Sequence, residues 1–468
     1  MKNPYIVVGL ACFAIACGDD EPASRLPCDA PSFSSALAAA GAGTEVTLGA
    51  CEIAGVFEVP AGVTVVGQGV GVTELRGDGT APVLDLAPGA GVRGVSIHVP
   101  GSFGIRARGV GAFDVRDVAI DVERGIAIGV RDASVFALSS ARITGPITSA
   151  NARDIGSPGA PSETGTYGVL AYDVMGLGAS EGLRLSDVEV RGFATAGVAI
   201  VRSTLHWAPG EGPLEDVIEG NRGHGLMVFG GSASLTDVRA CGTLSAPGLP
   251  GLTLTAAEGA VLETTRTTVC DGDGFGVFHD AATGSHTGLE VRGLGQAAVW
   301  AQARATLTVG EGSVLEGSGV AGVAAIDVEN VAITGTRISE IHEGPIPNGG
   351  AGAERMGDGV HVARTALSAP PVSVTLDDVE LVGNERIGAL LDGFEERATL
   401  SLRAVSVSGT GTQLGAVAQR VVELPVDWDA DVAREGATLA NDEAFAELRR
   451  VLEVSGIIMP PAAPPMLE

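Results

Sequence analysis

The sequence has few aromatic and few basic residues. Phenylalanine, tryptophan and tyrosine make up 4% of the 468 residues, although 45% of the chain is hydrophobic. This excludes a core built on large rings and favours small aliphatic side chains stacked in layers. Lysine and arginine number 29 against 57 acidic residues, which gives a net charge of −28. Such a chain repels phosphate backbones, and we expect no nucleic-acid partner.

Long apolar runs are scarce, and the clearest one lies at the N-terminus. Lys2 precedes an apolar run over residues 5–16 that is too short to span a bilayer and ends in Ala-Ile-Ala before Cys17. The pattern resembles a bacterial lipoprotein signal. The resemblance implies that residues 1–16 are a signal peptide, that Cys17 carries lipid, and that the protein is exported to the cell envelope or surface. An ordinary cleaved signal peptide with an incidental cysteine is the alternative.

Glycine, by contrast, is abundant and recurs in a phrase of glycine, apolar residue, any residue, apolar residue. The phrase returns roughly every 20 to 30 residues, a period typical of stacked repeats. Its opening residues are Gly104, Gly125, Gly168, Gly197, Gly225, Gly251, Gly276, Ala298, Gly322, Gly359, Gly388 and Gly415. Each unit offers two or three short strands, which fits one coil of a parallel β-helix better than a leucine-rich repeat or a propeller blade.

This period, the glycine starts and the asparagines before them at Asn221 and Asn384 resemble the right-handed parallel β-helix (pectate lyase-like) superfamily. The resemblance implies an all-β, single-stranded right-handed solenoid of about 12 coils over residues 45–420. Capping segments are expected on both sides. We assign residues 17–44 to a linker and cap with a short helix at Ser32–Ala40. Residues 421–468 form a C-terminal cap with a helix at 441–454 and a disordered, proline-rich tail from residue 460.

Cysteine is scarce, and four cysteines follow Cys17. They are Cys28, Cys51, Cys241 and Cys270. An even number in an exported chain predicts disulfide bonds. Proximity favours Cys28–Cys51 and Cys241–Cys270, and the second pair lies about one repeat apart. No CxxC spacing points to a metal at these residues.

The catalytic signatures of the superfamily are incomplete. Polygalacturonases carry Asn-Thr-Asp, Asp-Asp, Gly-His-Gly and Arg-Ile-Lys in that order. This chain has Gly-His-Gly at 223–225 and an Asp-Asp pair at 377–378, in the reverse order and without the other two. We therefore predict no catalytic residues and lean against an enzyme.

A pectate lyase-type calcium site is not indicated either. Side chains alternate along a strand, so the residue two after each opening glycine should point outward. That line contains no carboxylate. Four acids near the turns could instead gather on successive coils as a calcium site, with a solvated acidic turn as the alternative: Asp216, Asp237, Asp271 and Asp273. No other cofactor is indicated.

The outward line carries apolar side chains instead. Met227, Thr253, Phe278 and Trp300 fall on four consecutive coils. Flat apolar side chains at strand spacing can hold sugar rings or a partner protein. The predicted binding residues are Tyr172, Met227, Phe229, Phe278 and Trp300. The alternative is that an inserted loop or the C-terminal segment covers them.

The sequence thus predicts a lipid-anchored, monomeric surface β-helix that binds extracellular polysaccharide or a surface protein without catalysis. Two alternatives stay open. One is a carbohydrate-active enzyme, a polysaccharide lyase or glycoside hydrolase with a non-standard site. The other is a structural component of the envelope or of adhesion.

Overall fold

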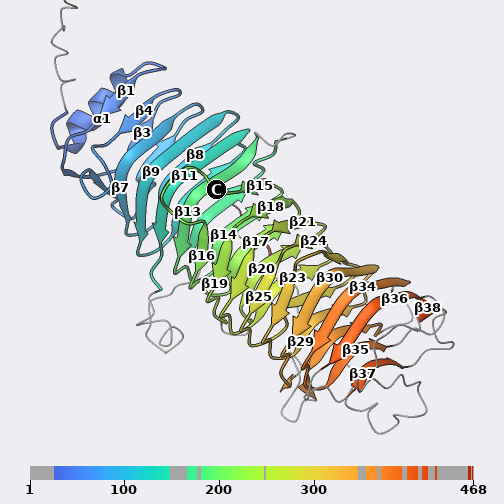
Figure 1. The fold of residues 1–468 in the computed structure, drawn as a ribbon. Helices are drawn as coiled ribbons and strands as arrows, with labels where there is room; N and C mark the ends of the chain where they lie inside the picture. The colour runs from blue at the N-terminus through green and yellow to red at the C-terminus, as the bar shows by residue number, and fades with distance from the viewer. Residues whose placement is uncertain are drawn as a thin grey trace, which may run out of the picture.

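The protein is a right-handed parallel β-helix, an elongated stack of coils whose strands pair in parallel with those of the next coil (Figure 1). This confirms the fold class expected from the repeat. The computed structural model describes residues 26–147, 166–176, 181–246, 249–345, 355–365, 369, 371–392, 398–408, 414–419, 427–428, 462–464 and 466.

One side of every coil belongs to a sheet that has 14 strands in the part of the chain that the structure describes. They are β3 (Phe57–Val59), β6 (Leu84–Leu86), β8 (Phe103–Arg108), β10 (Ile126–Arg131), β12 (Tyr167–Tyr172), β14 (Ala196–Val201), β17 (His224–Phe229), β20 (Leu252–Ala257), β23 (Phe275–Asp280), β26 (Val299–Gln302), β29 (Ala321–Ile326), β33 (Asp358–Ala363), β35 (Ile387–Asp392) and β37 (Leu414–Gln419). The glycine phrases mark β8 to β37, and β3 and β6 add two coils to the number that we expected.

The remaining sides of each coil belong to a second sheet, which has 22 strands among the described residues. They are β1 (Glu45–Thr47), β2 (Glu52–Ala54), β4 (Thr64–Val66), β5 (Glu74–Arg76), β7 (Gly91–Val99), β9 (Ala112–Val122), β11 (Val135–Thr144), β13 (Gly182–Arg191), β15 (Thr204–Trp207), β16 (Val217–Glu219), β18 (Ser232–Thr236), β19 (Arg239–Cys241), β21 (Val261–Thr265), β22 (Thr268–Cys270), β24 (Thr283–Thr287), β25 (Glu290–Arg292), β27 (Thr306–Val309), β28 (Val314–Glu316), β30 (Asn330–Ser339), β34 (Val372–Val382), β36 (Ala398–Ser408) and β38 (Asp427–Trp428).

Residues with left-handed backbone bend this second sheet into two sides. Strand β13, for example, pairs with β15 along its first half and with β16 along its second. The bend residues Asp117 (φ 51°), Ser140 (φ 49°) and Asp187 (φ 55°) lie in register in β9, β11 and β13. Aspartate adopts this conformation more readily than most residues because its short side chain can bond to nearby backbone. The coil therefore has three sides.

The interior is filled by aliphatic side chains from both sheets, such as Val169 and Ala171 of β12. The opening glycine of the repeated phrase lies where the chain turns into the 14-stranded sheet. A Cβ at Gly168 would lie 2.4 Å from the carbonyl oxygen of Gly197, and one at Gly197 would lie 2.9 Å from that of Gly225. Side chains do not fit at such distances. Close stacking of the coils therefore explains why glycine recurs.

Two coils depart from the predicted register. Ala127 and Thr253 occupy the corner position, and a Cβ on the glycine of the preceding coil would lie 2.6 and 2.5 Å from their carbonyl oxygens. The outward residues of these coils are therefore Gly129 and Thr255, two positions beyond the predicted ones. Thr253 does not belong to the outward line.

A short helix closes the N-terminal end of the stack. Helix α1 (Ala30–Ala39) begins after Asp29, whose carboxylate accepts a hydrogen bond from the backbone N–H of Ser32 (2.8 Å). Phe33 packs against Phe57 of β3, with 4.5 Å between ring centroids. The helix thus covers apolar side chains that the first coil would otherwise expose. The predicted C-terminal helix at 441–454 lies outside the described residues.

Both disulfide pairings favoured by the sequence are present. Cys241 of β19 and Cys270 of β22 are register partners on adjacent coils. Cys28, before α1, is bonded to Cys51, next to β2, so this bond ties the cap to the first coil. Cys17 lies outside the described residues, and its lipidation stays a prediction.

The part of the stack near residue 345 carries a small additional element. Strands β31 (Gly344–Pro345) and β32 (Arg355–Met356) form an antiparallel pair. Across the residues that the structure describes, no helix combines the length and apolar character needed to cross a bilayer.

Candidate functional site

The outer face of the 14-stranded sheet, where the sequence placed its candidate residues, changes character along the stack. The register places one outward residue of each strand in a continuous column. From the N-terminal end it runs Glu58, Asp85, Arg106, Gly129, Leu170, Ala199, Met227, Thr255, Phe278, Trp300, Ala324, His361, Leu390 and Val417. The column is charged over its first three residues and largely apolar thereafter.

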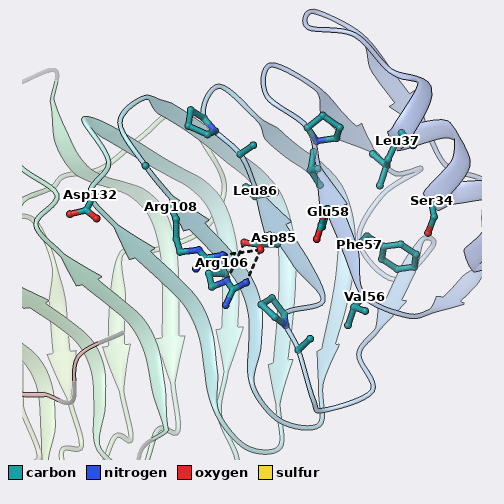
Figure 2. A pocket seen from close by; sticks show the side chains of 18 residues that line it. Ser34, Leu37, Val56, Phe57, Glu58, Asp85, Leu86, Arg106, Arg108 and Asp132 are labelled. Carbon is teal, nitrogen blue, oxygen red and sulfur yellow. Dashed lines mark hydrogen bonds and ion pairs between the residues drawn. The ribbon is translucent and has the colours of Figure 1, made fainter. Parts of the chain in front are cut away.

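The charged end of the column lines a groove of about 1020 Å³ between α1 and strands β3, β6 and β8 (Figure 2). Its charged residues are Glu58, Asp85, Arg106, Arg108 and Asp132. Glu58, Asp85 and Arg106 face outward because buried apolar residues flank each of them on its strand, as in Phe57-Glu58-Val59 of β3. The volume is at the upper end of the roughly 300–1,000 Å³ usual for ligand sites.

An ion-pair network occupies the centre of this groove. Arg106 binds Asp85 through two hydrogen bonds, Nε to Oδ1 at 3.1 Å and a terminal nitrogen to Oδ2 at 2.7 Å. Arg108 approaches Asp85 Oδ2 at 3.3 Å. The Arg106 guanidinium also lies 5.9 Å from the ring centroid of Phe103. These contacts hold the Arg106 donors at a fixed place in the groove, while Glu58 is exposed beside them.

The chemistry of this groove suits a polar, hydroxyl-rich ligand. A hydroxyl group both donates and accepts hydrogen bonds. A carboxylate can accept from its O–H and a guanidinium can donate to its oxygen, so the two groups together can bind it fully. The walls are apolar and rigid, because Pro60, Pro82 and Pro88 lie among the lining residues. The glycine phrase starts only at Gly104 in β8, so it marks the strand of Arg106 but not the acids of β3 and β6 that complete this site. An available signal was a single acid between two apolar residues in each of the short strands β3 and β6.

The predicted binding residues face outward as expected. They do not form an exposed strip, however, because side chains of the strip are buried. Tyr172 and Met227 are each 3% exposed, whereas Phe278 and Trp300 are fully buried. Phe229 is half-buried and packs against the cluster that contains Tyr172 and Met227. Their direction followed from alternation along the strands, whereas their burial depends on what lies over the sheet.

These side chains fall into two apolar clusters outside the main core. The first, here called the Tyr172 patch, consists of Tyr167, Leu170, Tyr172, Ala196, Ala199, Val201 and Met227. The second is centred on Phe275, Phe278 and Trp300, where the Trp300 ring lies 5.4 Å from that of Phe275 and its N–H donates to Gln302 (2.9 Å). The second cluster contains no exposed ring and can offer no sugar platform.

One residue of the proline-rich tail, Pro464, lies on the Tyr172 patch. The hydroxyl of Tyr172 donates a 2.6 Å hydrogen bond to the backbone carbonyl of Pro464. Pro464 is buried, whereas Ala462 and Ala463 before it are exposed. The alternative of coverage by the C-terminal segment thus holds at this place.

A buried charged cluster follows further along the outer face. Asp358 accepts hydrogen bonds from the Arg386 guanidinium, with Nε at 2.7 Å, and lies 2.8 Å from His361 Nδ1. Burial acts to raise the pKa of Asp358, but the Arg386 charge and the His361 hydrogen bond hold that pKa below its ordinary value. No polar partner contacts the buried Nε2 of His361 within the described chain. Within the cluster the Asp358 carboxylate and the Arg386 guanidinium neutralise each other.

The four acids considered for calcium do not gather. Asp216 is buried and accepts a hydrogen bond from the Trp207 indole (2.6 Å), and burial raises its pKa. Asp237 pairs with a neighbouring arginine, and Asp273 accepts from a serine hydroxyl. Among the described residues, no three potential ligands come together in a way that could hold a metal ion. The alternative of a solvated acidic turn does not hold for Asp216, which is buried.

No protein-family model matches the chain, and no curated protein matches it. Several solved structures are similar in fold. The catalytic domain of a GH87 α-1,3-glucanase in complex with tetrasaccharides aligns at 12% identity and a TM-score of 0.32, covering 85% of this chain. The A-module of mannuronan C-5 epimerase AlgE4 from Azotobacter vinelandii aligns at 14% identity and 0.32, covering 88% of this chain and 95% of that one. Pectate lyase Pel9A aligns at 10% identity and 0.35, covering 86% and 76%.

This chain spans 63% of the length of the glucanase domain. At these identities and TM-scores the likeness concerns the parallel β-helix fold alone. It carries no argument about activity.

Proposed function

We propose that the protein binds extracellular polysaccharide in the groove between α1 and strands β3, β6 and β8, without catalysis. The observation that carries the proposal is the groove of about 1020 Å³ with Arg106, Asp85 and Glu58 in register along its floor. Neighbouring strands lie about 4.8 Å apart. The stacked charged groups thus follow one line, along which an extended sugar chain can place successive hydroxyl groups.

The groove has features that favour a saccharide over a protein partner. Arg106 and Asp85 are anchored by each other rather than extended into solvent, which limits the entropy lost when they bind hydroxyl groups. The groove contains both signs of charge, so neither a strongly acidic nor a strongly basic surface is required of the partner.

The test is affinity gel electrophoresis of the full chain with soluble neutral and uronate-containing polysaccharides. We expect retardation by at least one of them and at least ten-fold weaker binding for Arg106→Ala. Arg266→Ala is the matched control. Arg266 likewise binds an aspartate, Asp237, through two hydrogen bonds, of 2.7 and 2.6 Å, but lies outside the groove. Equal binding by both variants would contradict the proposed site.

A carbohydrate-active enzyme is the second candidate, since two carboxylates and an arginine share one groove. Glu58 and Asp85 are register partners on neighbouring strands, and paired carboxylates act as acid and base in glycoside hydrolysis. Incubation with polygalacturonate and calcium, or with the polysaccharide that binds, tests for unsaturated or shortened products. Product formation that Glu58→Gln abolishes would favour the enzyme over the binding protein.

We further propose that the protein is exported and anchored by lipid at Cys17. Disulfide bonds such as Cys28–Cys51 persist in exported proteins and are rare in the cytosol, which supports export. The lipid anchor rests on the signal-like N-terminus. Expression in a bacterial host with an alkyne-labelled fatty acid should label the native chain and leave Cys17→Ser unlabelled. Labelling of both would refute the anchor.

A further inference from the structure

The Tyr172 patch holds a segment that is far away in the sequence. Tyr172 and Pro464 are 292 residues apart, yet the tyrosine hydroxyl donates a 2.6 Å hydrogen bond to the proline carbonyl. Pro464 belongs to the run Pro-Pro-Ala-Ala-Pro-Pro at residues 460–465. Such runs favour the polyproline II conformation, whose carbonyls have no internal partners and are open to donors. An aromatic hydroxyl donating to a proline carbonyl is a contact suited to this conformation.

The patch is also shaped for an apolar segment that brings no donors. Its outward side chains are tyrosine, leucine, alanine, valine and methionine, and a proline lacks the N–H that would otherwise be buried unpaired against them. Polyproline II is already extended before binding, so little conformational entropy is lost on docking. Pro464 is buried and Ala463 is exposed, so one side of the segment faces the patch while the other faces solvent.

We propose that the Tyr172 patch is a docking site for a proline-rich segment, occupied in cis by the chain's own residues 462–464. The site is distinct from the groove, because Tyr172 lies on β12 and the groove lies over β3, β6 and β8. The attachment of the segment to the same chain gives it a high effective concentration at the patch. A free proline-rich peptide therefore binds poorly while the cis segment is in place and well once the cis segment is disabled.

The test uses the full chain and a fluorescent peptide of residues 459–468. The variant in which Pro460, Pro461, Pro464 and Pro465 are all changed to serine disables the cis segment. We expect it to bind the peptide at least ten-fold more tightly than the native chain, measured by fluorescence anisotropy. In this variant tetranitromethane should nitrate Tyr172, which mass spectrometry detects in the corresponding peptide. The native chain should be protected.

Matched variants separate docking from folding. In the serine background, Tyr172→Phe removes the hydroxyl donor and should weaken peptide binding several-fold. Tyr167→Phe, a change of the same kind at an equally buried tyrosine of the patch, should leave binding unchanged. Equal peptide affinity for the native chain and the serine variant, continued protection of Tyr172 in that variant, or equal effects of the two tyrosine changes would each overturn the proposal.

Discussion

Two histidines face each other inside the stack, and they give the fold a predictable sensitivity to acid. The Nε2 atoms of His279 in β23 and His286 in β24 lie 2.9 Å apart, and His286 Nδ1 lies 2.9 Å from the hydroxyl of Thr264. Burial lowers the pKa of His279 to about 4. Burial and the neighbouring His279 lower the pKa of His286 well below its ordinary value. Both rings are therefore neutral at pH 7.

The pair fits because a glycine makes room for it. A Cβ at Gly284 would lie 2.4 Å from Nε2 of His279. In the adjacent coils the position of His279 holds alanine and that of Gly284 holds leucine: Ala256, Ala301, Leu262 and Leu307. The imidazole thus fills the space that a leucine side chain fills above and below.

Lowering the pH from 7.5 to 5 should destabilise this coil through the pair. His279 has a pKa of about 4 in the folded protein and an ordinary value of 6.5. Between these values the unfolded chain binds more protons, so stability is lost as the pH falls through the window. At pH 5 the solution lies 1.5 units below the ordinary value, which corresponds to about 2 kcal/mol at roughly 1.4 kcal/mol per unit. His286 adds a loss of the same sign.

The variant His279→Ala/Gly284→Leu/His286→Val copies the residues of the adjacent coils and removes both rings. We expect exchange protection of amides in β23 to β27 to fall about 30-fold or more in the native chain on moving to pH 5, after correction for intrinsic exchange. In the variant it should change far less. A local measurement is needed because long repeat stacks do not unfold in two states. The control variant, His206→Ser, replaces an outward-facing histidine by the residue at the same position in the next coil. It should show the same pH dependence of exchange as the native chain. Equal pH dependence in the triple variant and the native chain would refute this account.

Three further predictions concern other contacts. Trp300→Ala should lower the opening free energy of the coil around β26 by about 3–5 kcal/mol in hydrogen exchange because the ring is fully buried, and it should leave polysaccharide binding unchanged; a selective loss of binding would contradict its burial. Replacing Cys241 and Cys270 by serine opens a link across 29 residues and should cost about 3–4 kcal/mol, so an unchanged melting temperature would count against the bond. Asp29→Ala should weaken α1 by about 1 kcal/mol in hydrogen exchange, whereas Asp29→Asn keeps the cap; equal losses would exclude capping.

The stack could be predicted from the sequence because its rules are local. Glycine recurs wherever the corner of a coil leaves no space for a Cβ, as at Gly168, and each short strand alternates between interior and exterior. If the register of a strand is misjudged by two residues, the predicted outward side chains still point outward, whereas an error of one residue reverses every side chain. Outward orientation was therefore right for Phe278 and Trp300. The register error at Thr253 arose because a non-glycine residue holds the corner in that coil.

The covering of the faces could not be predicted in this way. Whether Tyr172 is exposed to water or covered by Pro464 depends on where a segment 292 residues away packs in the folded chain. No local sequence pattern encodes that position. The partners of buried polar groups are equally non-local. His361 lies close to Asp358 in the sequence, but Arg386, which neutralises Asp358, comes from the following coil.

The sequence by itself determined the period, the coil, the facing of its side chains and the disulfide partners, because these depend on neighbours within one repeat or between adjacent repeats. The tertiary structure alone decided which outward side chains are free to bind. It covered the apolar part of the 14-stranded sheet and left a charged groove open beside α1. Exposure depends on every segment that comes to lie over a surface, whereas facing depends on the strand itself.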